Sequence, residues 1–162
     1  MVTMMHFYVP ESKDLLAAFG ELSLRHEHLN HVLRMTVKTL AHLAVNEALD
    51  ATARDTSSQL RERVRKLARQ QLGEGETLLK LQALVERCKR ATDRRNDLVH
   101  SVWAKELDGE AVRRNSSHGW QPLPTVEELQ TLGADISALT NELNLARLEG
   151  FLYEALSARQ VQ

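Results

Sequence analysis

The residues of this chain best suited to chemistry are Arg95 and His100, which stand five positions apart in the segment Arg-Asn-Asp-Leu-Val-His. A histidine side chain has a reference pKa of ~6.5, so it can accept or donate a proton near neutral pH. A guanidinium group stays charged and can grip two phosphate oxygens as negative charge builds on them. The pair therefore suits cleavage of RNA by its own 2′-hydroxyl, a reaction that needs no metal.

The spacing of these residues leaves open how they would meet. Asn96 lies four positions before His100, so it is expected to orient the imidazole. Arg95 is about 140° from His100 around an ideal helix, and the two side chains diverge on a regular helix. They would meet through the length of the arginine, fraying of the helix end, or a second copy of the chain. Arg95 falls in phase with the apolar stripe of its helix, which favours the second copy. Arg94 also precedes the motif, and which arginine faces the site stays open.

A second polar segment, residues 25–31, contains three histidines and one glutamate. Its outer histidines are five positions apart instead of the four of a His-Glu-x-x-His zinc motif, so we predict no metal site. His26 falls in the apolar stripe of the first helix and is expected to be packed inside. Glu27 and Asn30 are candidates to line the same cleft as His100.

Cysteine and tryptophan add little chemistry. The single cysteine, Cys88, excludes an internal disulfide and a cysteine zinc cluster. Because it lies on the apolar face of its helix, we interpret it as a core residue and not as a nucleophile. Trp103 could stack on a base, but in a chain with only 4% aromatic residues we favour a role in anchoring a hairpin on the helices.

Charge is unevenly distributed. The net charge is −1, yet residues 60–95 carry 11 basic and 5 acidic side chains. A local basic face can bind phosphates even when the whole protein is nearly neutral. Arg61, Arg65 and Arg69 are the candidates on this segment to guide an RNA backbone. The alternative is a solvated helix face with ion pairs one turn apart.

Apolar periodicity predicts the elements that position these residues. Helical spacing extends over residues 12–49, 60–72, 76–102 and 125–158, and residues 55–58 form a turn and cap before the second of these segments. Asp108-Gly109 suits a type I′ turn, which predicts a β-hairpin at about residues 102–115. The fold expected is all-α, a four- or five-helix up-down bundle with a small β-hairpin between the last two long helices. We expect one domain over residues 1–162.

The motif Arg95-Asn96-x-x-x-His100 resembles the Arg-Asn-x3-His signature of the HEPN superfamily, the higher eukaryotes and prokaryotes nucleotide-binding domain. The helical bundle, the motif near the end of a late helix and the aromatic Trp103 just after it are also similar. The specific match covers six residues, whereas the architecture covers most of the chain.

The resemblance implies a bundle that is usually dimeric, with two motifs facing a shared cleft. Many members are metal-independent ribonucleases, often toxins of toxin–antitoxin pairs or parts of defence systems. By this match Arg95 and His100 would be catalytic and Asn96 would assist. Other members have lost catalysis and serve as binding or scaffold domains. The prediction is an endoribonuclease acting as a homodimer, with an antitoxin protein as a possible further partner and no cofactor. The alternative is a non-catalytic module that binds nucleotide, RNA or protein.

The N-terminus has no basic region followed by an apolar run, so its sequence does not have the pattern of a secretory signal. No segment approaches the ~20 apolar residues that a membrane span requires. We therefore expect a cytoplasmic protein that does not enter the membrane.

Overall fold

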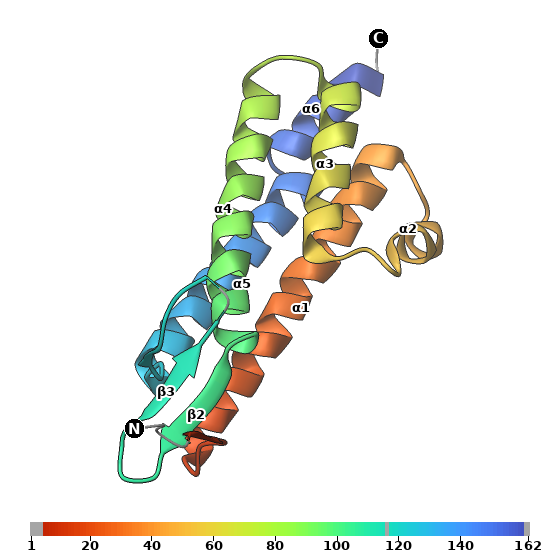
Figure 1. Cartoon of the computed structure of the whole chain (residues 1–162). Coiled ribbons are helices and arrows are strands. Elements are labelled where there is room, and N and C mark those ends of the chain that lie inside the picture. Colours follow the sequence, from red (N-terminus) through yellow and green to blue (C-terminus); the bar gives the residue numbers. More distant parts are fainter. Residues whose placement is uncertain (1–4, 116, 161–162) are drawn as a thin grey trace.

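The computed structural model describes residues 5–115 and 117–160. Within these ranges the chain forms six helices and four short strands (Figure 1). The helices are α1 (Lys13–Ala41), α2 (Val45–Thr52), α3 (Ser57–Leu72), α4 (Glu76–Val99), α5 (Val126–Leu148) and α6 (Phe151–Gln160). The strands are β1 (Met5–Phe7), β2 (Val102–Glu106), β3 (Ala111–Arg114) and β4 (Gln121–Pro122).

The helices pack around one elongated core. Figure 1 shows α1, α3 and α5 directed away from the end that carries the strands, with α4 returning toward it. The expected strict up-down alternation is thus not observed, because α2 turns the chain back before α3 begins. The core consists of leucines and other apolar residues from α1, α3, α4, α5 and α6. None of the described helices is long and apolar enough to cross a membrane.

The first predicted helix, residues 12–49, is in fact two helices. Ser12 begins α1 by accepting the Leu15 N–H on its hydroxyl at 3.2 Å. The helix ends where His42 adopts a left-handed conformation, with φ of 54°. A residue in this conformation ends a helix because the N–H groups at that point bond to carbonyls of the last turn. Here the His42 and Leu43 N–H groups both donate to the Lys38 carbonyl. No glycine or proline marks this turn, so composition alone did not predict it.

The last predicted helix, residues 125–158, is also interrupted. A capping box begins α5, in which Thr125 and Glu128 make reciprocal hydrogen bonds of 3.1 and 2.7 Å. The helix then breaks between α5 and α6 at Gly150. A Cβ at Gly150 would lie 3.1 Å from the Cα of Ala146, so the chain approaches itself too closely there for a side chain. Glycine at a helix break is a signal that the sequence did contain.

The helices that carry the motif residues begin and end close to the predicted places. Thr56 caps α3, and Gly73, with φ of 66°, ends it. Arg159 of α6 donates to the carbonyls of Gln71 and Leu72 at that end. The α4 helix ends at Val99, three residues earlier than predicted, and His100 follows as its C-cap with φ of −93° and ψ of 9°.

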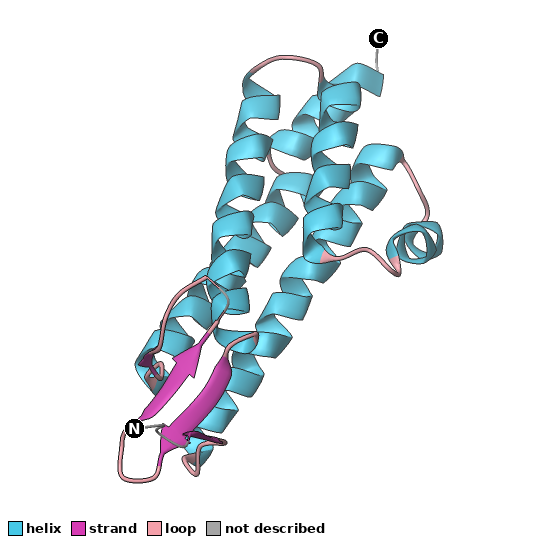
Figure 2. Ribbon diagram, viewed as in Figure 1, coloured by secondary structure: helices cyan, strands magenta, loops and turns pink. Residues whose placement is uncertain are grey.

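The strands form a four-stranded antiparallel sheet in the order β1-β2-β3-β4 (Figure 2). The predicted hairpin is its centre, with Ala104 opposite Val112. The description as all-α with a hairpin is therefore correct only in part. β1 and β4 come from segments too short to show periodicity, and their pairing depends on β2 and β3 being in place.

Two contacts fix this sheet on the helices. The Trp103 ring packs edge-on against Phe19 of α1, with centroids 5.5 Å apart. The Arg113 guanidinium donates to Asp97 of α4 at 3.0 Å and to Gln121 of β4 at 2.9 Å. The sheet therefore stabilises the end of α4 that carries the motif.

Candidate functional site

A polar groove of about 570 Å³ lies between α1, α3 and α4. Arg95, Asn96 and His100 line its α4 side. Glu27 and Asn30 line it from α1, and Arg61 lines it from α3. The structure thus brings together six of the residues singled out from the sequence, although they lie up to 73 positions apart in the chain.

Arg95 is half-buried in this groove and has no carboxylate within 4 Å among the described residues. Its Nη1 donates to the Asn96 Oδ1 at 3.1 Å, while its Nε is buried without a partner in the described part of the chain. Burial lowers the pKa of the guanidinium, and the negative charge of Glu27 opposes that shift. A desolvated cation of this kind favours an incoming anion.

His100 is exposed at the end of α4, and its backbone N–H donates to the Asn96 carbonyl at 2.9 Å. Because His100 is the C-cap, it leaves the regular helical path, and it shares the groove with Arg95 within one chain. Asn96 bonds Arg95 through its side chain and not the imidazole, which differs from the contact expected.

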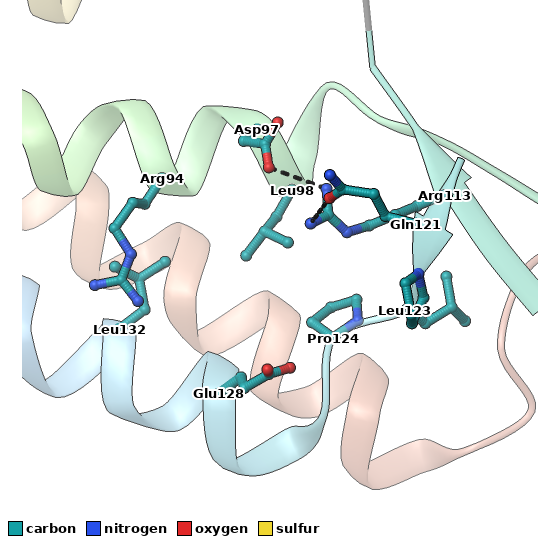
Figure 3. A pocket seen from close by; sticks show the side chains of 10 residues that line it. Arg94, Asp97, Leu98, Arg113, Gln121, Leu123, Pro124, Glu128 and Leu132 are labelled. Atoms are coloured by element: carbon teal, nitrogen blue, oxygen red, sulfur yellow. Dashed lines mark hydrogen bonds and ion pairs between the residues drawn. The ribbon is translucent and has the colours of Figure 1, made fainter. Parts of the chain in front are cut away.

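Arg94 lies on a different side of α4 from Arg95, about 100° around the helix, and does not line the groove. It lines a second pocket, of about 520 Å³, between α4, α5 and the sheet. Figure 3 shows Arg94 of α4 beside Leu132 of α5, and Asp97, further along α4, bonded to Arg113. The Arg94 Nη1 lies 3.6 Å from an Asp135 carboxylate oxygen. Arg94 also shares a shallow surface hollow with His100, so both arginines are neighbours of the histidine, from different sides.

Of the three arginines proposed on the basic helix, only Arg61 lines the groove. It is 5% exposed, and its Nη1 has no hydrogen-bond partner among the described residues. Burial lowers its pKa, and Asp93 opposes the shift. Arg65 pairs with Glu86 of α4 at 3.2 Å, a contact between two helices, and with Glu62 at 3.9 Å, which is an ion pair about one turn apart of the kind that the alternative expected. Arg69 lies exposed in the last turn of α3.

His26 lies at the base of the groove and is 2% exposed. Its Nε2 lies 3.2 Å from the hydroxyl of Thr92, also buried, and its Nδ1 has no hydrogen-bond partner in the described residues. Desolvation, reinforced by the charge of Arg95, lowers the pKa of His26 to about 4. The imidazole is therefore neutral at physiological pH. Its expected packing against the interior is confirmed.

A hydrogen-bond chain crosses the groove from α1 to α3. The Asn30 amide donates to Glu27 at 3.1 Å and accepts from the Ser57 hydroxyl at 2.7 Å. Asn30 is 6% exposed, so this chain fixes the start of α3 against α1. Glu27 is thereby engaged at the rim and does not contact Arg95 within ion-pair distance.

Positive charge exceeds negative charge in the groove. Its lining has four cationic and three acidic side chains, counting histidine as neutral. Two of the acids already have partners, since Asp93 pairs with Lys89 at 2.7 Å and Asp55 pairs with Arg63. Arg61, Arg95 and Arg34 have no carboxylate within 4 Å among the described residues, so the groove suits an anionic ligand. Nowhere in residues 5–115 and 117–160 do three histidine, cysteine or acidic residues gather as metal ligands.

The remaining candidates lie outside the groove. Cys88 is fully buried, and desolvation raises the pKa of its thiol to about 11, which confirms the prediction of a core residue. Trp103 anchors β2 on α1, as the favoured interpretation expected.

Sequence reasoning missed several groove residues, among them Ser57, Ser58 and Arg34. Ser57 and Arg61 are four positions apart on one helix, and this spacing could have placed the start of α3 at the same site. Arg34 lies eight residues after His26, about two turns further along α1. Helical spacing could therefore have placed Arg34 on the same face as His26. Asp97, inside the motif itself, received no role, yet it binds Arg113 and holds the sheet.

No protein-family model matches this chain, and neither a curated protein nor a solved structure matches it.

Proposed function

We propose that this chain is an endoribonuclease of the HEPN type that acts on an RNA strand bound in the α1–α3–α4 groove. One observation carries the proposal: Arg95 and His100 line a single groove in which Arg95 has no carboxylate partner within 4 Å among the described residues. An unpaired guanidinium next to an accessible imidazole is the minimum that metal-independent phosphodiester cleavage requires.

In the proposed reaction the 2′-oxygen of the RNA attacks the adjacent phosphorus. The bond from phosphorus to the 5′-oxygen breaks, giving a 2′,3′-cyclic phosphate and a 5′-hydroxyl. His100 accepts the proton of the 2′-hydroxyl or donates a proton to the departing 5′-oxygen. Arg95 binds the phosphate oxygens on which charge develops, and Asn96 holds the guanidinium in place through the 3.1 Å hydrogen bond.

Cleavage of RNA by the purified protein in the presence of EDTA tests this mechanism. His100→Ala should slow cleavage at least about 100-fold, the effect of removing a general acid or base. Arg95→Ala should act in the same direction, whereas Arg90→Ala, an exposed arginine outside the groove, should not. If His100→Ala cleaves as fast as the wild type, the mechanism is wrong. Arg94→Ala decides which arginine acts, and we expect it to retain activity because Arg94 already faces Asp135.

The proposed active form is a homodimer in which the grooves of two copies face each other. His100 is exposed at the groove edge, so a second copy could approach it. Sedimentation velocity at the concentrations used for cleavage tests this arrangement. A strict monomer with full activity would contradict it.

Reduced growth on expression of the wild type, and not of His100→Ala, would support a toxin role and the existence of a neutralising partner.

A second candidate is a binding module that holds RNA or a nucleotide without cleaving it. The hydrogen bond between Asn96 and Arg95 favours it, because Asn96 is then not available to orient the imidazole. Intact RNA together with saturable binding that Arg95→Ala abolishes would select this function over the first.

A further inference from the structure

The first turn of α3 presents free hydrogen-bond donors to the groove. Its capping box satisfies only the third N–H, since Gln59 donates to Thr56 Oγ1 at 3.3 Å. The backbone N–H groups of Ser57 and Ser58 have no acceptor among the described residues, and both residues line the groove. Unsatisfied N–H groups at the start of a 16-residue helix, together with its dipole, attract an anion.

A second observation at the same place is independent of the helix end. Arg61 follows Ser57 by four positions and Ser58 by three, so the three residues share one face of α3. Its side chain is 5% exposed, lines the groove and leaves Nη1 without a partner in the described residues. A buried guanidinium donor is costly to leave unsatisfied, and an anion in the groove would satisfy it through a charge-assisted hydrogen bond.

The neighbouring carboxylates do not bind the donors at the start of α3. Asp55, just before the helix, is engaged by Arg63, and Asp93 is engaged by Lys89. Asn30 accepts a hydrogen bond from the Ser57 hydroxyl and not from the Ser57 backbone N–H, which stays available. The donors that remain are two backbone N–H groups, the Ser58 hydroxyl and the Arg61 guanidinium.

We propose that the N-terminus of α3 and Arg61 form a phosphate-binding subsite, which holds a second phosphate of the RNA strand while Arg95 and His100 act on the scissile one. This inference rests on the proposed function for the identity of the strand, but the subsite itself requires only a phosphate group. Donors from backbone and guanidinium read no base, so the subsite positions the strand and contributes no sequence specificity.

The chain offers variants that remove one donor at a time. Proline is favoured at the first position of a helix, and Thr56 already has the extended conformation, φ of −71° and ψ of 164°, that precedes proline well. Ser57→Pro therefore deletes one N–H while keeping the helix. Ser57→Ala loses the same hydroxyl but keeps the N–H. Val45→Pro places proline at the first position of α2, outside the groove, and is the matched control.

Binding of short 2′-O-methyl RNA separates this subsite from catalysis, because such a strand cannot be cleaved. The probes are fluorescein-labelled oligomers with one internucleotide phosphate or with two, measured by anisotropy at one fixed salt concentration. In the wild type and in Val45→Pro the second phosphate should strengthen binding about tenfold, as expected for charge-assisted hydrogen bonds. Ser57→Pro should reduce this gain to about threefold or less, and Ser57→Ala should retain more of it than Ser57→Pro.

A titration with inorganic phosphate, followed by amide nitrogen–proton correlation spectra, tests the subsite without RNA. The Ser57 and Ser58 amide signals should shift in the wild type, and the Ser58 shift should be reduced in Arg61→Lys, which keeps the charge but loses the planar donor. Unchanged Ser57 and Ser58 signals, or an equal second-phosphate gain in the wild type and Ser57→Pro, would overturn the subsite. RNA cleavage that fails while both results hold would overturn the proposed catalysis and leave the subsite standing.

Discussion

Two arginines decide the character of the groove. Arg61 and Arg95 both leave a buried donor nitrogen without a partner in the described residues, and burial lowers the pKa of both guanidinium groups. Buried polar atoms normally have a hydrogen-bond partner, because a buried donor without one costs about 1–3 kcal/mol of stability. Two such groups in one groove could accept an anion without breaking an existing ion pair.

The buried imidazole of His26 provides a test of the groove's environment. Its pKa in the folded protein is about 4, below the value of 6.5 expected in the unfolded chain. Above pH ~6.5 both states are neutral and His26 has no effect on the pH dependence. Between these two pKa values the unfolded chain takes up a proton that the folded one does not, so stability falls as the pH falls.

We predict that acidification from pH 7 to pH 4 lowers the free energy of unfolding through His26 by up to about 3 kcal/mol. Urea unfolding of the wild type and His26→Gln over this range measures it, because the difference between the two removes the contribution of the carboxylates. The stability difference should shift in favour of His26→Gln as the pH falls. A difference that stays constant from pH 7 to pH 4 would show that His26 is not desolvated.

At the scale of the elements, the sheet holds the end of α4 in position. Arg113 of β3 reaches Asp97 at 3.0 Å, and the side chains of both residues are largely buried, at 13% and 27% exposed. The Trp103 ring of β2 contacts Phe19 of α1. His100 lies between the end of α4 and β2, so the position of the imidazole depends on these two attachments.

Asp97→Asn should therefore lower the free energy of unfolding by about 1–3 kcal/mol, because Arg113 loses its charged partner in a largely buried place. Thermal and urea unfolding measure the effect. Asp108→Asn, in the exposed turn between β2 and β3, removes the same charge from the sheet and should be nearly neutral. Equal effects of the two variants would mean that the sheet is not fixed through Asp97.

For the molecule as a whole, local charge matters more than net charge. The chain carries a net charge of −1, so no global attraction draws it to nucleic acid. Any affinity for RNA must come from the few cationic side chains of the groove that have no carboxylate within 4 Å in the described structure, namely Arg34, Arg61 and Arg95.

This arrangement predicts a shallow salt dependence of RNA binding. With two or three phosphates neutralised, the logarithm of the association constant should fall with the logarithm of salt concentration with a slope of about −1.5 to −2 for a single strand. Arg61→Gln should reduce the slope by about 0.7. Titrations of a 2′-O-methyl RNA between low and high salt measure both. A slope steeper than about −4 would indicate a larger basic surface than this groove.

The sequence by itself determined which segments are helical and which apolar residues of those segments form the core. Apolar periodicity placed α3 and α4 within a few residues, and the Asp108-Gly109 pair placed the centre of the sheet, since both signals are local in the chain. The type I′ turn expected there is not formed, because neither Asp108 nor Gly109 has a positive φ. The sequence also determined that Cys88 and His26 are inside. It did not show the break at His42, where packing of α2 overrides helical periodicity, nor the pairing of β1 and β4.

Only the tertiary structure decided which polar residues share a site. Glu27, Arg61 and Arg95 belong to three helices, and their proximity depends on how those helices pack. Spacing could not decide either whether Arg94 or Arg95 faces the groove, because both are compatible with the motif until α1, α3 and α5 take their places around α4. The free donors at the start of α3 became a candidate subsite for the same reason: a helix N-terminus attracts an anion in any sequence, but packing beside α1 and α4 gave this one a groove to face.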